Sequence, residues 1–452
     1  MRRYAQMESL IDAAVARSRV IDSVYLGRGV LTMAGEAAAN LTASRDAVIM
    51  ADEAGFAAAG APAITALETS GFTVSRIIKP SRPLPHASVE EAAAFCAALR
   101  NNHDMLPIAL GSGVINDLVR YAAFHTGKRF VSIATAASMD GYASGGAPLA
   151  QNGFKITIPT SPPAVILADI DIIAAAPAKM NGWGYGDLAG KIPAGGDWIL
   201  ADLVGAETID EFAFGLVQDG LRDWLANPRG VRRSDPDTIA ELFVGLTLVG
   251  FAMEAYGSSR PASGADHQIA HIWEMEGRNS QGQKVAHGAA VAVGTWAVLA
   301  LYDWLLEQDI ENLDIARTLS QSPDLARREG DLHRLFNDHR IGARANTELR
   351  AKHISSDLHK ERLERIIEGW PQTRDRLRQQ LVSAQEMAGM LRATGVPADP
   401  GDIGLSLADL IMTVRKAAYI RRRYTILDFL HETGLTEYAL HEAFSNYEKR
   451  CQ

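Results

Sequence analysis

Cysteine is nearly absent from this sequence of 452 residues, in which Cys96 and Cys451 are the only two. Two cysteines so far apart do not form the dense disulfide framework of small secreted folds, so we expect a reducing compartment. The N-terminal residues also lack the apolar run that forms the core of a secretory signal. Together, these two absences predict a cytoplasmic protein.

Long runs without a charged residue are also scarce. The longest, residues 285–302, is only just long enough for a membrane span, and it contains His287, Gly288, Gly294 and Thr295. This polar content favours a buried core helix. We therefore expect no membrane partner.

Basic residues are fewer than acidic ones. The chain has 45 lysines and arginines against 54 aspartates and glutamates, which gives a formal net charge of −9. A surface of this sign does not attract a polyanion, so we expect no nucleic-acid partner. The 47% of hydrophobic residues and 22% of charged residues are typical of a soluble globular protein, and the length predicts two or three domains.

The first part of the chain alternates short apolar runs with alanine-rich stretches. Strands are predicted at residues 46–52, 72–80, 105–113 and 129–137, with helices between them. This alternation predicts an α/β domain, residues 1–175, built on a Rossmann-like parallel sheet that binds a dinucleotide. Residues 155–159 and 164–169, separated by "TSPP", are predicted to be a strand pair joined by a tight turn.

After Pro177 the pattern becomes helical. Long amphipathic stretches cover residues 235–256, 287–308, 358–394 and 406–422, and strand signals are nearly absent. We expect residues 176–452 to form an all-helical domain that binds metal and substrate.

Two features of the α/β part are candidates for nucleotide binding. In "ALGSGVINDLVRY", Gly111 and Gly113 lie where a strand leads into a helix, whose free N–H groups can bind a pyrophosphate. A plain turn is the alternative. Asp52 ends the strand "VIMAD", where a carboxylate can bind a ribose and would repel a 2′-phosphate, which favours NAD; a helix cap is the alternative.

Two further segments contain polar residues among small ones. "IATAASMDGYASGGA", residues 133–147, follows a predicted strand, and ligands bind at the carboxyl ends of parallel strands. A flexible polar loop is the alternative. In "GWGYGDLAGK", Asp187 and Lys191 are four residues apart, which fits either an ordinary surface ion pair or two groups that face a pocket.

Three histidines lie close together in the second half. His267 and His271 in "HQIAH" would project from one face of a helix, and His287 follows in "KVAHG". This grouping favours a metal site over satisfied core histidines. Gln268 occupies the position of the general base in the zinc-protease motif H-E-x-x-H, and an amide cannot accept that proton, so a protease of this type is disfavoured.

Taken in order, a set of motifs resembles the sn-glycerol-1-phosphate dehydrogenase family, within the superfamily of iron-containing alcohol dehydrogenases and dehydroquinate synthase-like enzymes. The motifs are "GSGVIND", "TAASMDGYASGGA", "GFKITIP", "ADIDIIAAAP", "GYGDLAGK", "SSRPASGADHQIAH" and "HG". The resemblance extends over roughly residues 24 to 435. It implies the dehydroquinate synthase-like fold, in which an α/β domain with a Rossmann-like parallel sheet precedes an all-α domain.

The resemblance also implies a divalent metal, usually zinc, with nickel or iron in relatives, bound by Asp187, His267 and His287. His271 and Asp140 would contact the substrate, with His271 as a proton relay. The residues that it implies for NAD or NADP binding are Gly113, Val114, Ile115, Asn116, Asp117, Thr135, Ala136, Ala137, Ser138 and Ser144. We add Asp52, Gly111 and Ser112 from the strand ends described above, and Lys155 in the motif "GFKITIP". From charge and position we add Lys191 and Arg260 as candidates for the substrate phosphate.

The implied reaction is the NAD(P)-dependent interconversion of sn-glycerol 1-phosphate and dihydroxyacetone phosphate by a cytoplasmic homodimer. Three alternatives stay open: a dehydrogenase of another polyol or polyol phosphate, a dehydroquinate synthase-like lyase, and a non-catalytic scaffold protein. Net production of NADH separates a dehydrogenase from the lyase, which regenerates its cofactor within each cycle.

Overall fold

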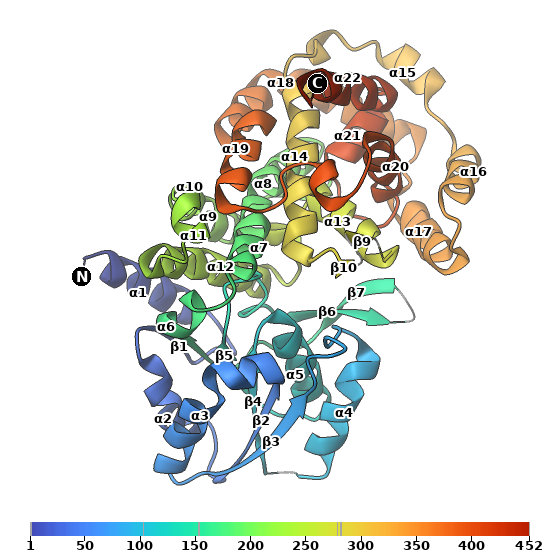
Figure 1. Ribbon diagram of the computed structural model, residues 1–452. Coiled ribbons are helices and arrows are strands. Elements are labelled where there is room, and N and C mark those ends of the chain that lie inside the picture. The colour runs from blue at the N-terminus through green and yellow to red at the C-terminus, as the bar shows by residue number, and fades with distance from the viewer. Residues whose placement is uncertain (1, 103, 152–153, 278, 281–282, 452) are drawn as a thin grey trace. The chain divides into compact units, whose positions relative to one another are not determined.

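The computed structural model describes residues 2–102, 104–151, 154–277, 279–280 and 283–451 (Figure 1). The chain divides into two compact units. The first comprises Met1–Leu188 and Gly215–Ser259, and the second comprises Ala189–Phe214 and Arg260–Gln452.

The first unit is built on a six-stranded sheet with the strand order β1-β8-β5-β4-β2-β3 (Figure 1). Every neighbouring pair in it is parallel, which confirms the predicted parallel sheet. The strands are β1 (Ser23–Gly27), β2 (Asp46–Asp52), β3 (Thr73–Lys79), β4 (Leu106–Gly111), β5 (Val131–Ala134) and β8 (Val165–Asp169).

Both faces of this sheet are covered by helices. Successive residues of a strand point to opposite faces, so Ile49 packs with the helices of one face and Val48 with those of the other. The first face is covered by α2 (Ala34–Ala39) and α3 (Glu53–Thr69), and the second by α4 (Val89–Arg100) and α5 (Gly113–His125). The central strands are therefore almost completely apolar, as in parallel sheets generally.

The predicted strand pair 155–159 and 164–169 is wrong. β7 (Phe154–Pro159) pairs antiparallel with β6 (Gly146–Gln151), whereas β8 lies in the main sheet between β1 and β5. The physical reason is burial: all five residues of β8 are buried, which suits a central strand, while β7 alternates and suits a two-stranded ribbon. Pro162 and Pro163 in the connection also lack the N–H groups of a hairpin turn.

The remaining elements of the first unit are mostly helical. They are α1 (Arg2–Val15), η1 (Val30–Met33), α6 (Ile170–Ala174), α7 (Ala178–Ala189), α10 (Leu221–Trp224), α11 (Pro228–Arg232) and α12 (Pro236–Tyr256). Two helices continue across the limits of the units: the last residue of α7 is the first of the second unit, and α9 (Glu211–Gln218) is divided between the two.

The second unit is helical apart from a short ribbon of β9 (Asn279–Ser280) and β10 (Gln283–Lys284). Residues 358–394 are not one continuous helix as the pattern suggested, because α18 ends at Gln380 and α19 begins at Ala384. The helices are α8 (Lys191–Leu203), η2 (Arg260–Ala262), α13 (Ala265–Met275), α14 (His287–Leu305), η3 (Ile310–Asn312), α15 (Ile315–Gln321), α16 (Leu325–Leu335), α17 (His339–Lys352), α18 (Ser356–Gln380), α19 (Ala384–Thr394), η4 (Pro400–Ile403), α20 (Leu407–Ala417), α21 (Ile426–Glu432) and α22 (Thr436–Cys451).

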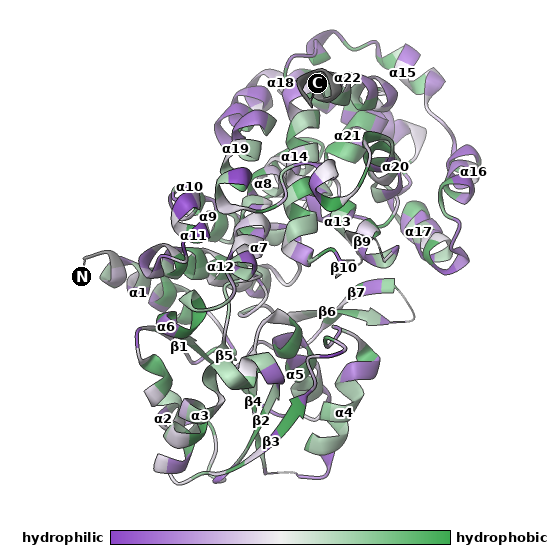
Figure 2. Cartoon of the chain, in the orientation of Figure 1, coloured by the Kyte–Doolittle hydropathy of each residue, from purple (hydrophilic) through white to green (hydrophobic). Residues whose placement is uncertain are grey.

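Two helices, α12 and α14, are long and apolar enough to cross a membrane. Both are mostly buried inside the protein, α12 to 83% and α14 to 89% of the apolar stretch. In the second unit α14 is pale to green in Figure 2, while α16 and α19 carry much purple. Each apolar helix is thus a core helix, as expected for residues 285–302.

Candidate metal centre and cofactor site

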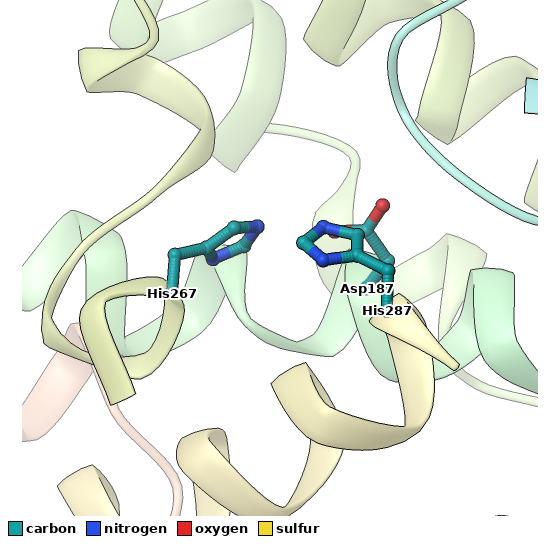
Figure 3. A group of neighbouring side chains, drawn as sticks. All are labelled: Asp187, His267 and His287. Atoms are coloured by element: carbon teal, nitrogen blue, oxygen red, sulfur yellow. The ribbon is translucent and has the colours of Figure 1, made fainter. Parts of the chain in front are cut away.

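Three side chains that the sequence predicts as metal ligands lie together. Asp187 is in the last turn of α7, His267 is near the start of α13, and His287 is the first residue of α14. One ligand atom of each lies within 4.8 Å of the other two (Figure 3). Asp187 and His267 are buried and His287 is partly exposed. This is the spacing that a single bound cation requires.

Each of the two histidines is held by a carboxylate. Asp266 Oδ2 lies 2.5 Å from His267 Nδ1, and Glu274 Oε1 lies 2.5 Å from His287 Nδ1. A carboxylate on Nδ1 fixes the tautomer that keeps the proton there, which leaves Nε2 as the metal-binding atom. Orientation of ligand histidines by a carboxylate is typical of metal sites.

The carboxylate ligand is also oriented from outside. The backbone N–H of Asp140 donates to Asp187 Oδ2 at 3.1 Å. One carboxylate and two imidazoles are the borderline N and O donors that bind zinc, iron or nickel, and three protein ligands leave positions for substrate. The donor chemistry of these side chains therefore fits a catalytic divalent metal.

The second histidine of "HQIAH" faces the same group. The ring of His271 stacks on that of His287, with centroids 5.9 Å apart and planes 19° apart, and its centroid is 6.1 Å from that of His267. Potential ligand atoms of His271, Glu274 and His287 also lie within 4.8 Å of one another. His271 thus stands next to the predicted ligands, as expected for a residue that contacts the substrate.

One face of α7 lies along the loop that follows β5, residues 135–145. Asn181 Oδ1 accepts a hydrogen bond from the N–H of Ala137 at 3.3 Å. At Gly184, a Cβ atom would lie 1.9 Å from the carbonyl oxygen of Ala137, so only glycine permits this approach. Together with the Asp140–Asp187 bond, these contacts place the 135–145 loop against the helix that carries Asp187.

The glycine motif "GSG" connects β4 to α5. Ser112 is the N-cap of α5 and makes no side-chain capping bond. A Cβ atom on Gly113 would lie 2.7 Å from Met139 Cγ, so this glycine admits the 135–145 loop against the helix start. The carbonyl oxygen of Gly111 accepts from the N–H of Thr135 at 3.2 Å. The predicted nucleotide residues of the two segments are therefore neighbours.

Several of the residues predicted to bind cofactor have contacts within the protein. Ser132 Oγ donates to Asn116 Oδ1 at 2.9 Å, and Ile115 is buried. Burial raises the pKa of the Asp117 carboxyl to about 7, against the opposing charges of Arg120 and Lys155. Asn116 thus connects α5 to β5, and Asp117 accepts a hydrogen bond from Arg120 of the same helix.

The remaining predicted cofactor residues are distributed around the same end of the sheet. Ser144 Oγ donates to the carbonyl oxygen of Gly146 at 2.9 Å. Lys155 lies on β7, opposite Ala150 of β6. Thr135, Ala136 and Ala137 are buried, and Val114 and Ser138 are partly buried.

Asp52 caps the helix that follows it. Its Oδ1 accepts a hydrogen bond from the N–H of Gly55 at 2.8 Å, so the helix-cap interpretation is confirmed. Because β2 and β4 are adjacent, with Ala51 opposite Leu110, Asp52 also ends beside Gly111. After β2 the chain continues to β3 on one side, and after β4 it continues to β5 on the other side. Dinucleotides bind at such a point in parallel sheets.

The two candidates for the substrate phosphate are both buried, and both interact with other groups of the protein. Lys191 is the first residue of α8 and is buried. Arg260 is also buried, and its guanidinium donates to the carbonyl oxygens of Tyr424 and Asp197 at 2.9 and 2.8 Å, and it pairs with Glu207 at 3.2 Å. Those bonds make Arg260 a tie between segments of the second unit.

Sequence reasoning did not find the carboxylates that hold the histidines. Asp266 directly precedes His267, and Glu274 lies three residues after His271, on the same face of α13. An acidic residue at helical spacing from a predicted ligand is the signal that could have found Glu274. Arg120, which binds the 135–145 loop, gave no comparable signal.

Comparisons with known proteins show the family to which the chain belongs. A family model described as iron-containing alcohol dehydrogenase matches residues 25–177. The chain is 34% identical over 268 residues to glycerol-1-phosphate dehydrogenase (NAD(P)+) of Bacillus velezensis, covering 58% of this chain and 68% of that protein. It is 30% identical over 325 residues to the protein of the same name from Halalkalibacterium halodurans, covering 72% and 71%.

Solved structures show the same fold at low identity. A glycerol dehydrogenase from Schizosaccharomyces pombe has a TM-score of 0.59 at 15% identity and covers 95% of this chain, with 92% of its own chain covered. An NADH-dependent butanol dehydrogenase from Thermotoga maritima has a TM-score of 0.58 at 14% identity, covering 91% and 95%.

Proposed function

Because this chain belongs to the glycerol-1-phosphate dehydrogenase family of the iron-containing alcohol dehydrogenase superfamily, we propose that it oxidises and re-forms sn-glycerol 1-phosphate at C2. In the forward direction sn-glycerol 1-phosphate and NAD(P)+ give dihydroxyacetone phosphate, NAD(P)H and a proton. The observation that carries the proposal is the convergence of Asp187, His267 and His287 within 4.8 Å. The substrate and the cofactor in this proposal come from the names of two relatives, which are 30% and 34% identical to this chain.

Asp187, His267 and His287 would hold a divalent metal, with zinc proposed first and nickel or iron as alternatives. When bound there, such a metal would supply Lewis-acid chemistry for the oxidation at C2. Asp266 and Glu274 hold the two imidazoles in the required tautomer.

Two side chains would act on the substrate directly. His271, stacked on His287, would take the hydroxyl proton of C2 and pass it to solvent, since an imidazole exchanges protons near neutral pH. Asp140, whose backbone already binds Asp187, would contact a substrate hydroxyl.

Recognition of the phosphate is assigned by charge. The positive charge of the Lys191 ammonium would attract the negatively charged phosphate. Arg260 is the second candidate for the phosphate, with its guanidinium held by Tyr424, Asp197 and Glu207.

For the dinucleotide we propose the carboxyl end of β4 and β2, where the start of α5 offers N–H groups to the pyrophosphate. The residues proposed to line this site are Asp52, Gly111, Ser112, Gly113, Val114, Ile115, Asn116, Asp117, Thr135, Ala136, Ala137, Ser138, Ser144 and Lys155. The Asp52 carboxylate favours NAD over NADP. We further propose a homodimer that acts in the cytoplasm, which sedimentation of the purified protein would test for its assembly state.

The experiment is an assay of dihydroxyacetone phosphate reduction with NADH and with NADPH, before and after treatment with a chelator. We expect chelation to abolish turnover and His267→Ala and His287→Ala each to lower it at least about 100-fold, because a Lewis acid supplies several kcal/mol and each 1.4 kcal/mol is tenfold. His333→Ala, an exposed histidine of α16, is the matched control. Wild-type turnover in either site variant would remove that histidine from the metal ligands.

The same assay decides among the alternatives. Faster turnover with another polyol or its phosphate would reassign the substrate. A lyase of the dehydroquinate synthase type would show no net oxidation of NADH. Absence of bound metal together with absence of any nucleotide-induced shift in melting temperature would indicate a non-catalytic protein.

A further inference from the structure

A buried arginine holds one end of the 135–145 loop. Arg120, on the second turn of α5, has none of its surface exposed. One terminal nitrogen, Nη2, donates to the carbonyl oxygens of Gly141 and Tyr142, the latter at 3.1 Å. The other, Nη1, donates to the carbonyl oxygen of Gly146 at 2.9 Å and to Asp117 Oδ1 at 2.8 Å. A single side chain thus binds three carbonyl oxygens, two in the loop and one at the first residue of β6.

The other end of the loop touches the helix of the predicted metal ligand. Three residues on one face of α7 contact the loop. Asn181 and Gly184 both contact Ala137, and Asp187 contacts Asp140. The last of these contacts is the N–H of Asp140 on Asp187 Oδ2. The bond to Asp187 is therefore formed by the residue that directly precedes the first carbonyl held by Arg120.

The loop has little freedom to compensate for a lost anchor. At Gly113 of α5 a Cβ atom would meet Met139, and at Gly250 of α12 it would lie 3.0 Å from the carbonyl oxygen of Asp140. Tyr142, which is buried, donates through its hydroxyl to the carbonyl oxygen of Ala136 at 2.9 Å. The loop is thus packed between helices, and a displacement at Gly141 is transmitted to the amide of Asp140.

We propose that Arg120 is a positioning residue for the metal ligand Asp187, acting through the loop. It fixes the peptide units that follow Gly141 and Tyr142. The first of these lies two peptide units along the chain from the Met139–Asp140 peptide, whose N–H orients the Asp187 carboxylate. The inference rests on the proposed metal-dependent function. A guanidinium is required because its planar fork serves several acceptors at once, whereas an ammonium is a point charge that binds them in fewer directions.

The first test compares Arg120→Lys with Arg129→Lys. Arg120→Lys keeps the positive charge beside Asp117 but cannot serve all the carbonyl oxygens, whereas Arg129→Lys makes the same substitution at an exposed arginine that pairs with Asp22. The affinity of the metal-free proteins for Zn²⁺ is measured by competition with a chromophoric chelator. We expect Arg120→Lys to weaken binding 10- to 100-fold, the usual effect of losing an outer partner of a ligand, and Arg129→Lys to change it less than about 3-fold.

Two further readouts separate positioning from loss of fold. The visible spectrum of Co²⁺-loaded protein reports the geometry of the ligands, and we expect it to differ between Arg120→Lys and wild type. Hydrogen exchange of the peptide containing Asp140 should be faster in the metal-free variant, while exchange of α14 is unchanged. Wild-type affinity and spectrum in a folded Arg120→Lys protein would overturn the inference.

A second variant keeps the inference testable if Arg120 substitutions do not fold. Asp140→Pro removes the N–H that reaches Asp187, together with the Asp140 carboxylate, and we expect at least 10-fold weaker Zn²⁺ binding. Asp140→Ala removes the carboxylate and keeps the N–H, so it is the control and should bind Zn²⁺ within about 3-fold of wild type. Unchanged binding in the proline variant would also overturn the inference. If the wild-type protein itself bound no metal, the proposed function would fail instead, so the two failures are distinguishable.

Discussion

The two carboxylates that hold the imidazoles set how well each histidine can bind a metal. Asp266 and Glu274 each lie 2.5 Å from an Nδ1 atom, so they fix both the ring orientation and the position of the proton. In the proposed site they would act behind the ligands, so their effect would be on the affinity for the metal. A histidine without such a partner would exchange tautomers and rotate, which costs binding free energy.

This argument gives a prediction for Asp266→Asn and Glu274→Gln. Each variant replaces a charged acceptor by an amide of the same size, so we expect the affinity for Zn²⁺ to fall 10- to 100-fold with little change in melting temperature of the metal-free protein. Competition with a chromophoric chelator measures the first and thermal unfolding in EDTA the second. Glu386→Gln, an exposed residue of α19, is the control. Equal affinities would show that the carboxylates are not needed to orient the rings.

At the scale of the residue, the sequence contains enough information to propose ligands and too little to propose their supports. His267 and His271 share a helix face, and motif order identifies Asp187 and His287. The role of Arg120 depends on backbone carbonyl groups, which every residue has, so no side-chain pattern marks it. At Asp52 the sequence leaves two roles open, because an aspartate at the end of a strand can cap the following helix and can also accept hydrogen bonds from a ribose.

The two helices that carry the histidines approach each other at a glycine. At Gly294 of α14, a Cβ atom would lie 2.5 Å from the carbonyl oxygen of Asp266 and 3.2 Å from its carbonyl carbon. Those atoms belong to helix backbone, which cannot move aside as a flexible side chain can. The spacing of α13 and α14, and hence of His267 and His287, depends on the absence of a side chain at this position.

We predict that Gly294→Ala forces the helices apart. The expected result is a loss of about 1–3 kcal/mol in stability from overpacking, together with at least 10-fold weaker Zn²⁺ binding. Gly389→Ala on α19 is the matched control, because nothing lies within 4 Å of its Cβ position, and it should raise stability by up to about 1 kcal/mol through helix propensity. Thermal unfolding and metal competition measure both. Wild-type behaviour of Gly294→Ala would contradict the role assigned to this contact.

For a single helix or strand, the periodicity of the sequence predicts that the element exists and which type it is. It does not predict as well which other element pairs with it. Residues 46–52 are a strand with those bounds, and the predicted helix 235–256 is α12, in which Asp235 is the N-cap. Strand pairing is not encoded locally, which is why β7 was paired with the wrong neighbour. The break between α18 and α19 does have a local signal: Ser383 accepts a hydrogen bond from the N–H of Glu386, the S-x-x-E pattern of a helix start.

At the scale of the whole molecule, composition and alternation were sufficient to predict the fold class. A parallel sheet covered on both faces requires buried strands separated by helices, and that rhythm is visible in the first half of the chain. Which helices join which compact unit is a different matter, because it depends on contacts between distant segments. Several helices after residue 175 belong to the first unit and the rest to the second.

A buried carboxylate in the second unit links these distant segments and makes its stability depend on pH. Asp197 on α8 accepts hydrogen bonds from the N–H of Ala265 at 2.7 Å, the N–H of Ile426 at 2.8 Å and the hydroxyl of Tyr302 at 2.7 Å. It thereby joins the starts of α13 and α21 to α14. Burial raises the pKa of Asp197 from 3.8 to about 6, although these bonds and Arg260 act in the opposite direction.

The sign of the effect follows from proton binding. Between pH 4 and 6 the folded protein retains a proton on Asp197 that the unfolded chain has released, so the contribution of this group to stability is largest at low pH and falls as the pH rises through 6. The difference of about two pH units corresponds to about 3 kcal/mol. Asp197→Asn does not titrate at this position. We therefore compare the melting temperature of wild type with that of the variant, and we expect wild type to gain several degrees relative to the variant when the pH is lowered from 7.5 to 5. Differential scanning fluorimetry of the two metal-free proteins across this range measures the gap. A gap that is constant, or that grows with pH, would mean that Asp197 is ionised throughout in the folded protein and that its three donors outweigh the cost of burying its charge.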